Sequence, residues 1–380
     1  MQFKDIIGQS EIKSKLIDTV KENRISHAQL FLGTEGIGKL ALAIAYAQYI
    51  CCENKAENDS CGICPSCSKY QKLIHPDLHF VFPITTPKSG KKISEQFITK
   101  WREKVNDNPY FNLNQWIEII GAENKQGLIY TDESREIMYK INLKSFESEY
   151  KIMIIWMAEK MHISIANKML QIFEEPPEKT LFILISEQTD VILPTIISRT
   201  QIIKIPKIDD LSLRQYLKEK HQIDDNEISD IIRLSEGNMI NVLENINSSG
   251  LNEINFDLFM NMMRFSFSLK YVDINNLTEE FRTLGRERQK QFLKYAMRMI
   301  REYYMLSSGN KVLSKLTDTE TNKDEKFASV FPKFINNSNV QKIYEELNKA
   351  YFHITRNGYA RIIFFDMMIK INKYIAKKPS

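Results

Sequence analysis

The pattern of apolar positions divides the chain into a first part that mixes strands with helices and a second part that is helical throughout. Short apolar runs occur at 27–32, 151–156, 181–186 and 201–205. Runs of this length without alternating polar residues are typical of parallel strands buried on both faces. From about Pro206 onward only helical spacing remains. The pattern therefore predicts an α/β domain with a mostly parallel sheet flanked by helices, followed by helical domains.

Changes of spacing and turn residues place the domain boundaries. We expect an α/β domain over residues 1–205, a small helical lid over 206–250 and an all-α C-terminal domain over 251–380. The last boundary follows Ser248-Ser249-Gly250, where we expect a break between helices.

A segment between the first two apolar runs interrupts the α/β pattern. Residues 83–127 contain turn signals around two short amphipathic helical stretches, one with Trp101 and one with Trp116. We interpret this segment as an insertion. Its aromatic side chains are expected to pack onto the parent domain, and docking of a partner is the alternative.

All five cysteines fall within residues 51–67. Disulfides link distant segments of secreted proteins, whereas clustered thiols in a cytoplasmic chain favour a metal site. The spacing C-x8-C-x2-C-x2-C provides short turns, and four thiolates can surround Zn²⁺ at ~2.3 Å. The sequence therefore predicts a closed structural zinc site, with Cys51 as a spare thiol on the preceding helix. The predicted ligands are Cys52, Cys61, Cys64 and Cys67.

The first apolar run leads into a glycine-rich loop and then into an Ala- and Leu-rich helix over 40–50. This order is typical of a phosphate-binding loop, where backbone N–H groups, a lysine and the helix N-terminus hold phosphate. The residue after the lysine is normally Ser or Thr, which binds Mg²⁺. Leu40 stands there instead, so the loop is degenerate, and the sequence leaves open whether it retains ATP or ADP. The predicted phosphate-binding residues are Gly33, Gly36, Gly38 and Lys39.

Composition and charge exclude several classes of protein. Hydrophobic residues at 43% and charged residues at 26% are globular values, which excludes a disordered chain. No apolar stretch approaches the ~18 residues of a membrane helix, and the N-terminal residues are too polar for a signal peptide. We therefore expect a cytoplasmic protein. After residue 250 there are 22 Lys and Arg against 14 Asp and Glu. This excess favours a nucleic acid or acidic partner, but a solvated helical surface is the simpler interpretation.

These features together resemble the clamp-loader subunits of bacterial DNA polymerase III, within the AAA+ superfamily, and among them the δ′ type. The resemblance covers about the first 205 residues apart from the insertion. It implies an AAA+ domain, a lid and a C-terminal oligomerisation (collar) domain. The implied partners are γ/τ and δ subunits, the sliding clamp and, within the complex, primer–template DNA. The matching segments are the loop entry at 27–39, the four-cysteine module, HPDLH at 75–79, SREI at 134–137, the stretch from Ala166 to EEPP at 174–177, and the stretch from Leu193 to SRT at 198–200.

The family includes ATP-hydrolysing subunits (γ and τ) and a non-hydrolysing δ′ subunit. A working Walker B strand ends in acidic residues that bind Mg²⁺ and polarise the attacking water. Here the run at 151–156 ends in Trp156-Met157, and Glu159 lies too far along to replace them. Asn241 stands where the resemblance places a lid arginine. Together with Leu40, these residues remove three parts of the hydrolysis machinery, so we expect no intrinsic ATPase.

Arg199, in Ser198-Arg199-Thr200, matches the arginine finger of the family. The resemblance implies that it acts in trans on ATP bound to a neighbouring ATPase subunit, and we expect it to be solvent-accessible and not locked in an internal ion pair. The leading hypothesis is a δ′-type subunit of the DNA polymerase III holoenzyme that helps to load the sliding clamp during DNA replication. The alternatives are an active γ/τ-type clamp-loader ATPase and a stand-alone zinc-binding nucleic-acid protein.

Overall fold

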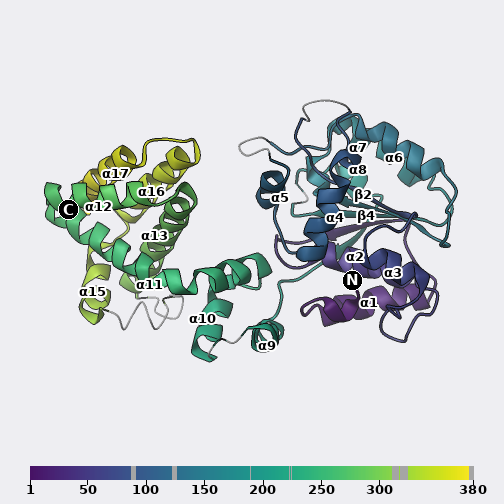
Figure 1. Ribbon diagram of the computed structural model, residues 1–380, viewed down its shortest axis with the longest axis horizontal. Helices are drawn as coiled ribbons and strands as arrows, with labels where there is room; N and C mark the ends of the chain where they lie inside the picture. Colours follow the sequence, from purple (N-terminus) through teal and green to yellow (C-terminus); the bar gives the residue numbers. More distant parts are fainter. Residues whose placement is uncertain are drawn as a thin grey trace. The chain divides into compact units, whose positions relative to one another are not determined.

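The computed structural model describes residues 1–86, 91–121, 126–188, 190–221, 223, 225–309, 316 and 324–375. The chain divides into two compact units, Met1–Glu244 and Asn245–Ser380. The first unit combines a sheet with helices, whereas the described part of the second consists of helices (Figure 1).

The first unit is built around a sheet of five parallel strands in the order β2-β3-β4-β1-β5. Every residue of β3 and β4 is buried, which explains their uninterrupted apolar sequence. The predicted parallel sheet is confirmed. Strand β2 was not predicted, because it has four residues and includes the polar His79. The strands are β1 (Ala28–Leu32), β2 (Leu78–Val81), β3 (Lys151–Trp156), β4 (Thr180–Ser186) and β5 (Gln201–Lys204).

Helices cover both faces of this sheet. The helices of the first unit are α1 (Ser10–Lys21), α2 (Lys39–Ile50), α3 (Pro65–Gln71), α4 (Ile98–Asp107), α5 (Leu113–Ile119), α6 (Glu133–Asn142), α7 (Ile163–Glu174), α8 (Pro194–Ile197), α9 (Asp210–Lys220) and α10 (Asp225–Ser235). Its 3₁₀ turns are η1 (Phe3–Asp5), η2 (Ser94–Phe97) and η3 (Ala158–Lys160). Alternate strand residues point to opposite faces. Phe31 and Ile154 join a core with α2, whereas Leu30 and Ile155 join a core with α6 and α7 (Figure 1).

Helices α4 and α5 belong to the predicted insertion, of which residues 87–90 and 122–125 lie outside the described residues. Trp101 and Trp116 are fully buried, and their ring centroids lie 5.1 Å apart in an edge-to-face arrangement. The ring of Phe82, just beyond β2, stacks on Trp101 at 4.2 Å. The prediction that these aromatic side chains pack onto the parent domain is confirmed.

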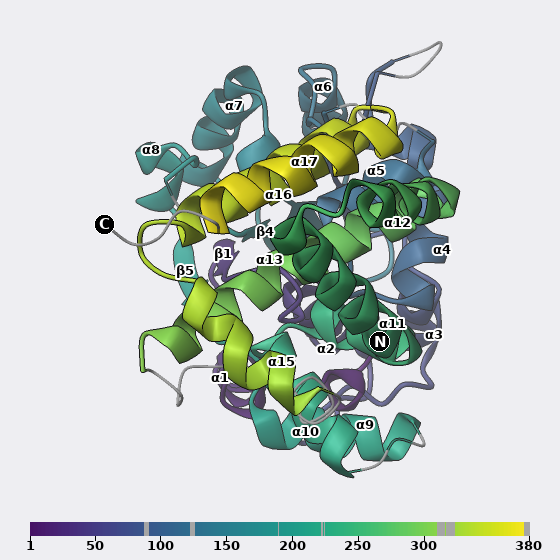
Figure 2. The ribbon, with the colours of Figure 1, turned by 90° about the vertical axis from the view of Figure 1, so that its left-hand side faces the viewer.

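The second unit is a helical bundle with its own apolar core (Figure 2). Helix α12 packs against α17, and α13 packs against α16. Phe281 stacks on Phe364 with ring centroids 4.2 Å apart. No helix within the described ranges is both long and apolar enough to cross a membrane. The helices are α11 (Met239–Ser268), α12 (Tyr271–Thr283), α13 (Arg286–Ser307), α15 (Glu325–Val330), α16 (Val340–Thr355) and α17 (Ala360–Ile375), with the 3₁₀ turn η5 (Phe331–Phe334).

The expected break between helices at 248–250 is wrong, because α11 continues through these residues. A glycine inside a helix costs only about 1 kcal/mol relative to alanine, which a helix of 30 residues tolerates. The two compact units divide at Glu244 and Asn245, inside α11. The separation of a lid over 206–250 from the α/β domain stays a prediction.

Candidate functional site

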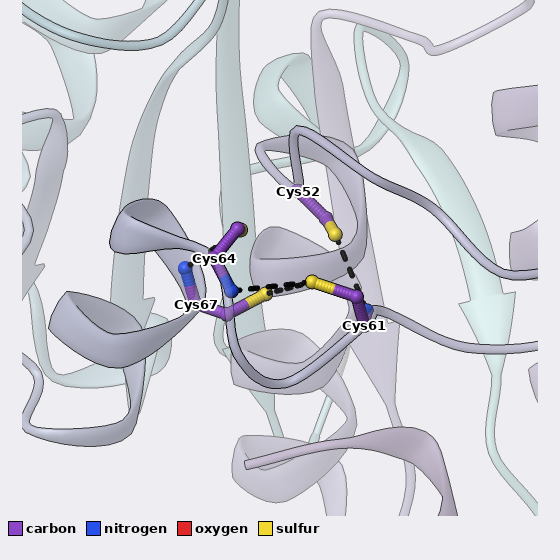
Figure 3. Close-up of side chains that lie close together, drawn as sticks. All are labelled: Cys52, Cys61, Cys64 and Cys67. Atoms are coloured by element: carbon purple, nitrogen blue, oxygen red, sulfur yellow. Dashed lines mark hydrogen bonds between the residues drawn. The ribbon is translucent and has the colours of Figure 1, made fainter.

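The four predicted zinc ligands converge on one point. Cys52 follows α2, Cys61 lies in the next loop, Cys64 caps α3, and Cys67 lies in the first turn of α3 (Figure 3). Their sulfur atoms all lie within 4.8 Å of one another, and the sulfurs of Cys61 and Cys67 are 3.9 Å apart. Tetrahedral coordination at ~2.3 Å separates sulfurs by about 3.8 Å. The cluster is thus slightly wider than an ideal zinc site, and it could hold a metal such as zinc.

Backbone amides stabilise negative charge on these sulfurs. The N–H groups of Cys61, Cys64 and Cys67 donate to the sulfurs of Cys52, Cys61 and Cys64, at 3.3, 3.3 and 3.4 Å. Hydrogen bonds from the backbone N–H groups of Ile63 and Cys64 lower the pKa of the Cys61 thiol to about 6, whereas burial raises the pKa of the Cys67 thiol. Metal ligands must be thiolates, and a divalent cation would offset the burial of their charge. The donor set therefore fits a structural zinc ion.

Cys51 lies outside the cluster. Its sulfur accepts a hydrogen bond from the Tyr70 hydroxyl at 3.1 Å, and its thiol lies 3.7 Å from the Tyr150 carbonyl oxygen. Burial raises the pKa of the Cys51 thiol to about 11. Cys51 is therefore a buried structural thiol, which agrees with its prediction as a spare.

The cysteine loop also binds the start of the chain. The Asp59 carboxylate accepts the backbone N–H groups of Phe3 and Lys4, each at 3.0 Å. The Gln2 side chain donates to the Ser60 carbonyl oxygen at 2.5 Å. A metal that orders this loop would therefore also order η1.

The glycine-rich loop joins β1 to α2 as predicted. Gly36 and Gly38 have φ angles of 71° and 91°, in the left-handed region that favours glycine. The Lys39 side chain is buried, and its ammonium donates to the carbonyl oxygens of Gly33, at 2.6 Å, and Thr34. In this structure the lysine therefore binds the loop itself.

Three carboxylates lie around Lys39. Burial lowers the pKa of Lys39 to about 8, and the charges of Glu187, Glu159 and Glu35 oppose this shift. The Glu187 N–H donates to Glu159 Oε1 at 3.2 Å. These three residues and Lys160 line a cavity of about 230 Å³ beside the loop. The charged groups lining the cavity thus carry an excess of negative charge.

The positions at which the sequence predicts a loss of hydrolysis hold side chains that cannot replace the missing groups. Leu40 is buried in the core beneath the loop. Trp156 and Met157 are also buried, and Met157 has a φ of 58° that turns the chain away from β3. Asn241 lies in the first turn of α11, where its N–H approaches Asn238 Oδ1 at 3.4 Å. Neither a leucine, a tryptophan nor a methionine can supply an oxygen ligand to Mg²⁺.

Arg199 follows α8 and is partly exposed, which confirms its predicted accessibility. Its Nη2 donates to Glu174 Oε1 at 2.5 Å, and its Nη1 donates to the Thr195 carbonyl oxygen at 3.1 Å. Arg199 therefore has an ion-pair partner within the chain that the sequence did not predict, although both side chains are exposed. The physical reason is that α7 and α8 pack together, which brings Glu174, the last residue of α7, close to Arg199, the second residue after α8.

Two residues of these sites were missed by sequence reasoning. Glu174 lies in the Glu-Glu-Pro-Pro segment that the resemblance singled out, but no pattern linked it to Arg199. Asp59 belongs to no motif, and its partners in η1 are more than 50 residues away in the sequence.

Known proteins similar to this chain include several subunits of DNA polymerase III. Residues 8–209 match the family described as DNA polymerase III, delta subunit. DNA polymerase III subunit delta' of Bacillus subtilis is 30% identical over 213 residues, which are 56% of this chain and 52% of the relative. DNA polymerase III subunit gamma of Buchnera aphidicola is 29% identical over 230 residues, 60% of this chain and 52% of the relative.

The chain spans about half the length of these two relatives. A crystal structure of a DNA polymerase III gamma subunit-related protein from Thermotoga maritima aligns with 96% of this chain and 99% of its own, at 15% identity and a TM-score of 0.43. The family match covers more than half of the sequence and includes the glycine-rich loop, the four cysteines and Arg199. The chain therefore belongs to the DNA polymerase III delta-subunit family.

Proposed function

We propose that this chain is a δ′-type clamp-loader subunit that does not itself hydrolyse ATP. In this role it assembles with γ/τ and δ subunits and helps to load the sliding clamp onto primer–template DNA. The family match supports a place in DNA polymerase III. Because the relatives include both a delta' and a gamma subunit, the choice between the two types rests on the residues of the nucleotide site.

The observation that carries this choice is the end of β3. Trp156 and Met157 are each only 5% exposed and belong to the apolar core. ATP hydrolysis in this class of enzyme needs a carboxylate at the strand end and a hydroxyl after the loop lysine, both directed at Mg²⁺. Leu40, 3% exposed, replaces the hydroxyl. Both metal-binding positions are therefore apolar and buried.

The chemical contribution of this subunit is Arg199, supplied to ATP on a neighbouring subunit. A guanidinium at the γ-phosphate offsets the charge that develops in the transition state, and such arginines raise rates by ~10³–10⁵. The pair with Glu174 does not prevent this, because an exposed ion pair contributes only about 0–1 kcal/mol. Phosphate oxygens can therefore replace the carboxylate.

The metal has a structural role in this proposal. Cys52, Cys61, Cys64 and Cys67 would hold Zn²⁺ and leave no coordination position for water. The bound ion would supply charge neutralisation for the thiolates and no catalysis. The hydrogen bonds from the N–H groups of Phe3 and Lys4 to Asp59 then keep the cysteine loop in place against η1. The second unit serves as the oligomerisation (collar) domain.

The test is ATP hydrolysis by a complex assembled from this chain, its candidate γ/τ and δ partners, the clamp and primed DNA. We expect Arg199→Ala to lower the rate at least tenfold without loss of assembly. Arg24→Ala is the matched control, because Arg24 is an exposed arginine paired with Glu22. Arg199→Lys should rescue poorly, because an ammonium lacks the planar fork of a guanidinium. Full clamp-loading and ATPase rates with the alanine variant would contradict the proposed role.

The alternative is an active γ/τ-type ATPase, and the specific observation in its favour is that Glu159 and Glu187 lie near Lys39. A measurement of ATP hydrolysis by the isolated chain distinguishes the δ′-type subunit from the active γ/τ-type ATPase. We expect no ATP hydrolysis above background, even with clamp and DNA. Robust Mg²⁺-dependent turnover that disappears in Lys39→Ala would support the active type instead.

A further inference from the structure

The insertion crosses the glycine-rich loop at Tyr110. This side chain is 8% exposed, and a Cβ atom on Gly38 would lie only 3.1 Å from its ring. Its hydroxyl accepts the backbone N–H of Ile7 at 3.3 Å. Tyr110 therefore connects three segments that are distant in sequence: the start of the chain, the insertion and the glycine-rich loop.

The residues after Tyr110 continue along the same edge of the sheet. The Phe111 ring lies 5.1 Å from Trp156 and 5.6 Å from Trp101, so it covers the end of β3 with aromatic surface. Asn112, Leu113 and Asn114 then line the cavity of about 230 Å³ that also contains Glu35, Glu159 and Glu187. The segment 110–114 thus runs from Gly38 to the cavity beside Lys39.

Gly36 of the loop contacts Asn238 and Met239, where α11 begins. A Cβ atom on Gly36 would overlap the Asn238 side chain, at 1.7 Å from its oxygen. The backbone N–H of Met239 also donates to the Gly36 carbonyl oxygen at 2.9 Å. A phosphate bound at this loop would approach the backbone around Gly36 and Gly38. The Asn238 and Tyr110 side chains already lie against these two glycines.

The charges around the loop also disfavour phosphate binding. Lys39, the cation that would meet a phosphate, is bonded to Gly33 and Thr34 and has three carboxylates around it. Like charges in a partly enclosed site repel strongly, because little water screens them. A triphosphate would therefore meet carboxylates where it needs cations.

We infer that segment 110–114 of the insertion is an internal plug of the glycine-rich loop. The Tyr110 side chain fills the approach to Gly38, and Glu35, Glu159 and Glu187 take the place of phosphates as counter-charges of Lys39. This inference goes beyond the proposed function, which requires only that the chain does not hydrolyse ATP. It assigns the insertion a role within the chain: exclusion of nucleoside phosphates.

The test uses the full chain alone and a fluorescent ATP analogue, with and without Mg²⁺. We expect no saturable binding by the wild type up to about 1 mM analogue, and binding at least tenfold tighter than this limit by Tyr110→Ala. Tyr110→Phe keeps the ring and loses only the hydrogen bond to Ile7, so it should bind no better than the wild type. Tyr130→Ala, which truncates a half-buried tyrosine bonded to Thr86, controls for general loosening.

Circular dichroism melting establishes that each variant is folded, and Tyr110→Leu provides a milder truncation for the same measurement. Wild-type binding as tight as that of Tyr110→Ala would overturn the inference, and so would a folded Tyr110→Ala or Tyr110→Leu chain that binds no nucleotide. Adding Glu187→Gln to Tyr110→Ala should tighten binding of the ATP analogue about threefold or more. Unchanged binding would overturn the inference that the carboxylates oppose phosphate binding. These measurements do not involve Arg199 or the assembled complex, so their failure is distinguishable from failure of the proposed function.

Discussion

Arg199 donates to the carboxylate of Glu174, with 2.5 Å between Nη2 and Oε1. The two residues belong to two segments that the sequence singles out separately, Glu-Glu-Pro-Pro and Ser-Arg-Thr. The side chains are 36% and 53% exposed, respectively, so solvent reaches both partners. Under the proposed function, Glu174 holds the guanidinium at the surface until phosphate oxygens of a neighbouring subunit replace it.

We predict that Glu174→Gln changes the free energy of unfolding by less than about 1 kcal/mol, because exposed ion pairs contribute little. Urea denaturation of the variant and the wild type measures this difference, with Glu175→Gln as the matched control. The difference should shrink further at high salt, which screens exposed charges. A loss above about 2 kcal/mol would show that the pair is structural, and it would argue against Arg199 as a group available to a partner.

Zinc content gives the second prediction. The chain should purify with about one zinc per molecule, because four convergent thiolates fill a tetrahedral site. Cys61→Ser should abolish binding, whereas Cys51→Ser should not, because the Cys51 sulfur is bonded to Tyr70 instead. Elemental analysis of freshly purified, reduced protein measures both effects. Protein without zinc under these conditions would exclude the site.

The cysteine cluster shows which parts of a site can be predicted from a sequence. Its four ligands lie within 16 residues, so their spacing alone restricts where the sulfurs can go. The same holds for β1, the glycine-rich loop and α2, which are consecutive. The contacts of Tyr110 with Ile7 and of Glu174 with Arg199 join residues 103 and 25 positions apart. Such contacts depend on how helices and insertions pack, and no local pattern encodes them.

The fold shows the same distinction. The long apolar runs of β3 and β4 predicted central strands, because a fully buried strand leaves little room for polar residues. Strand β2 has four residues and was missed. The break expected at 248–250 was wrong because Ser and Gly are weak signals, and a long helix can include them.

The third prediction concerns the contact between the cysteine loop and η1. Asp59→Ala should leave the N–H groups of Phe3 and Lys4 without their acceptor and cost about 1–3 kcal/mol. Hydrogen exchange at these two amides should speed up in the variant, and also in the wild type after chelation of the metal. Glu57→Ala, an exposed acid in the same loop, is the control. Unchanged exchange after chelation would mean that the loop keeps its shape without metal.

The last prediction is a pH dependence of stability that comes from Glu133. This side chain is 2% exposed, and its carboxylate accepts the backbone N–H of Ser94 at 2.6 Å and the Ser94 hydroxyl at 3.1 Å. Burial nevertheless raises the pKa of Glu133 from 4.5 to about 7. The folded state therefore binds this proton more tightly than the unfolded state does. Its contribution to stability is fully present below pH 4.5 and is lost as the pH rises to about 7, by at most about 3 kcal/mol.

Glu133→Gln keeps an acceptor oxygen for Ser94 but cannot ionise. The variant should match the wild type in free energy of unfolding near pH 4.5 and should be the more stable protein at pH 7.5. Urea denaturation at the two pH values measures this, and Glu136→Gln, on the same helix and less buried, provides the control. An equal difference between variant and wild type at both pH values would mean that the pKa of Glu133 is the same in the folded and the unfolded chain. Any pH dependence would then have to come from other groups. One of them is the half-buried His79, whose pKa burial lowers to about 4. It acts with the opposite sign, because its contribution to stability is lost as the pH falls from 6.5 to 4.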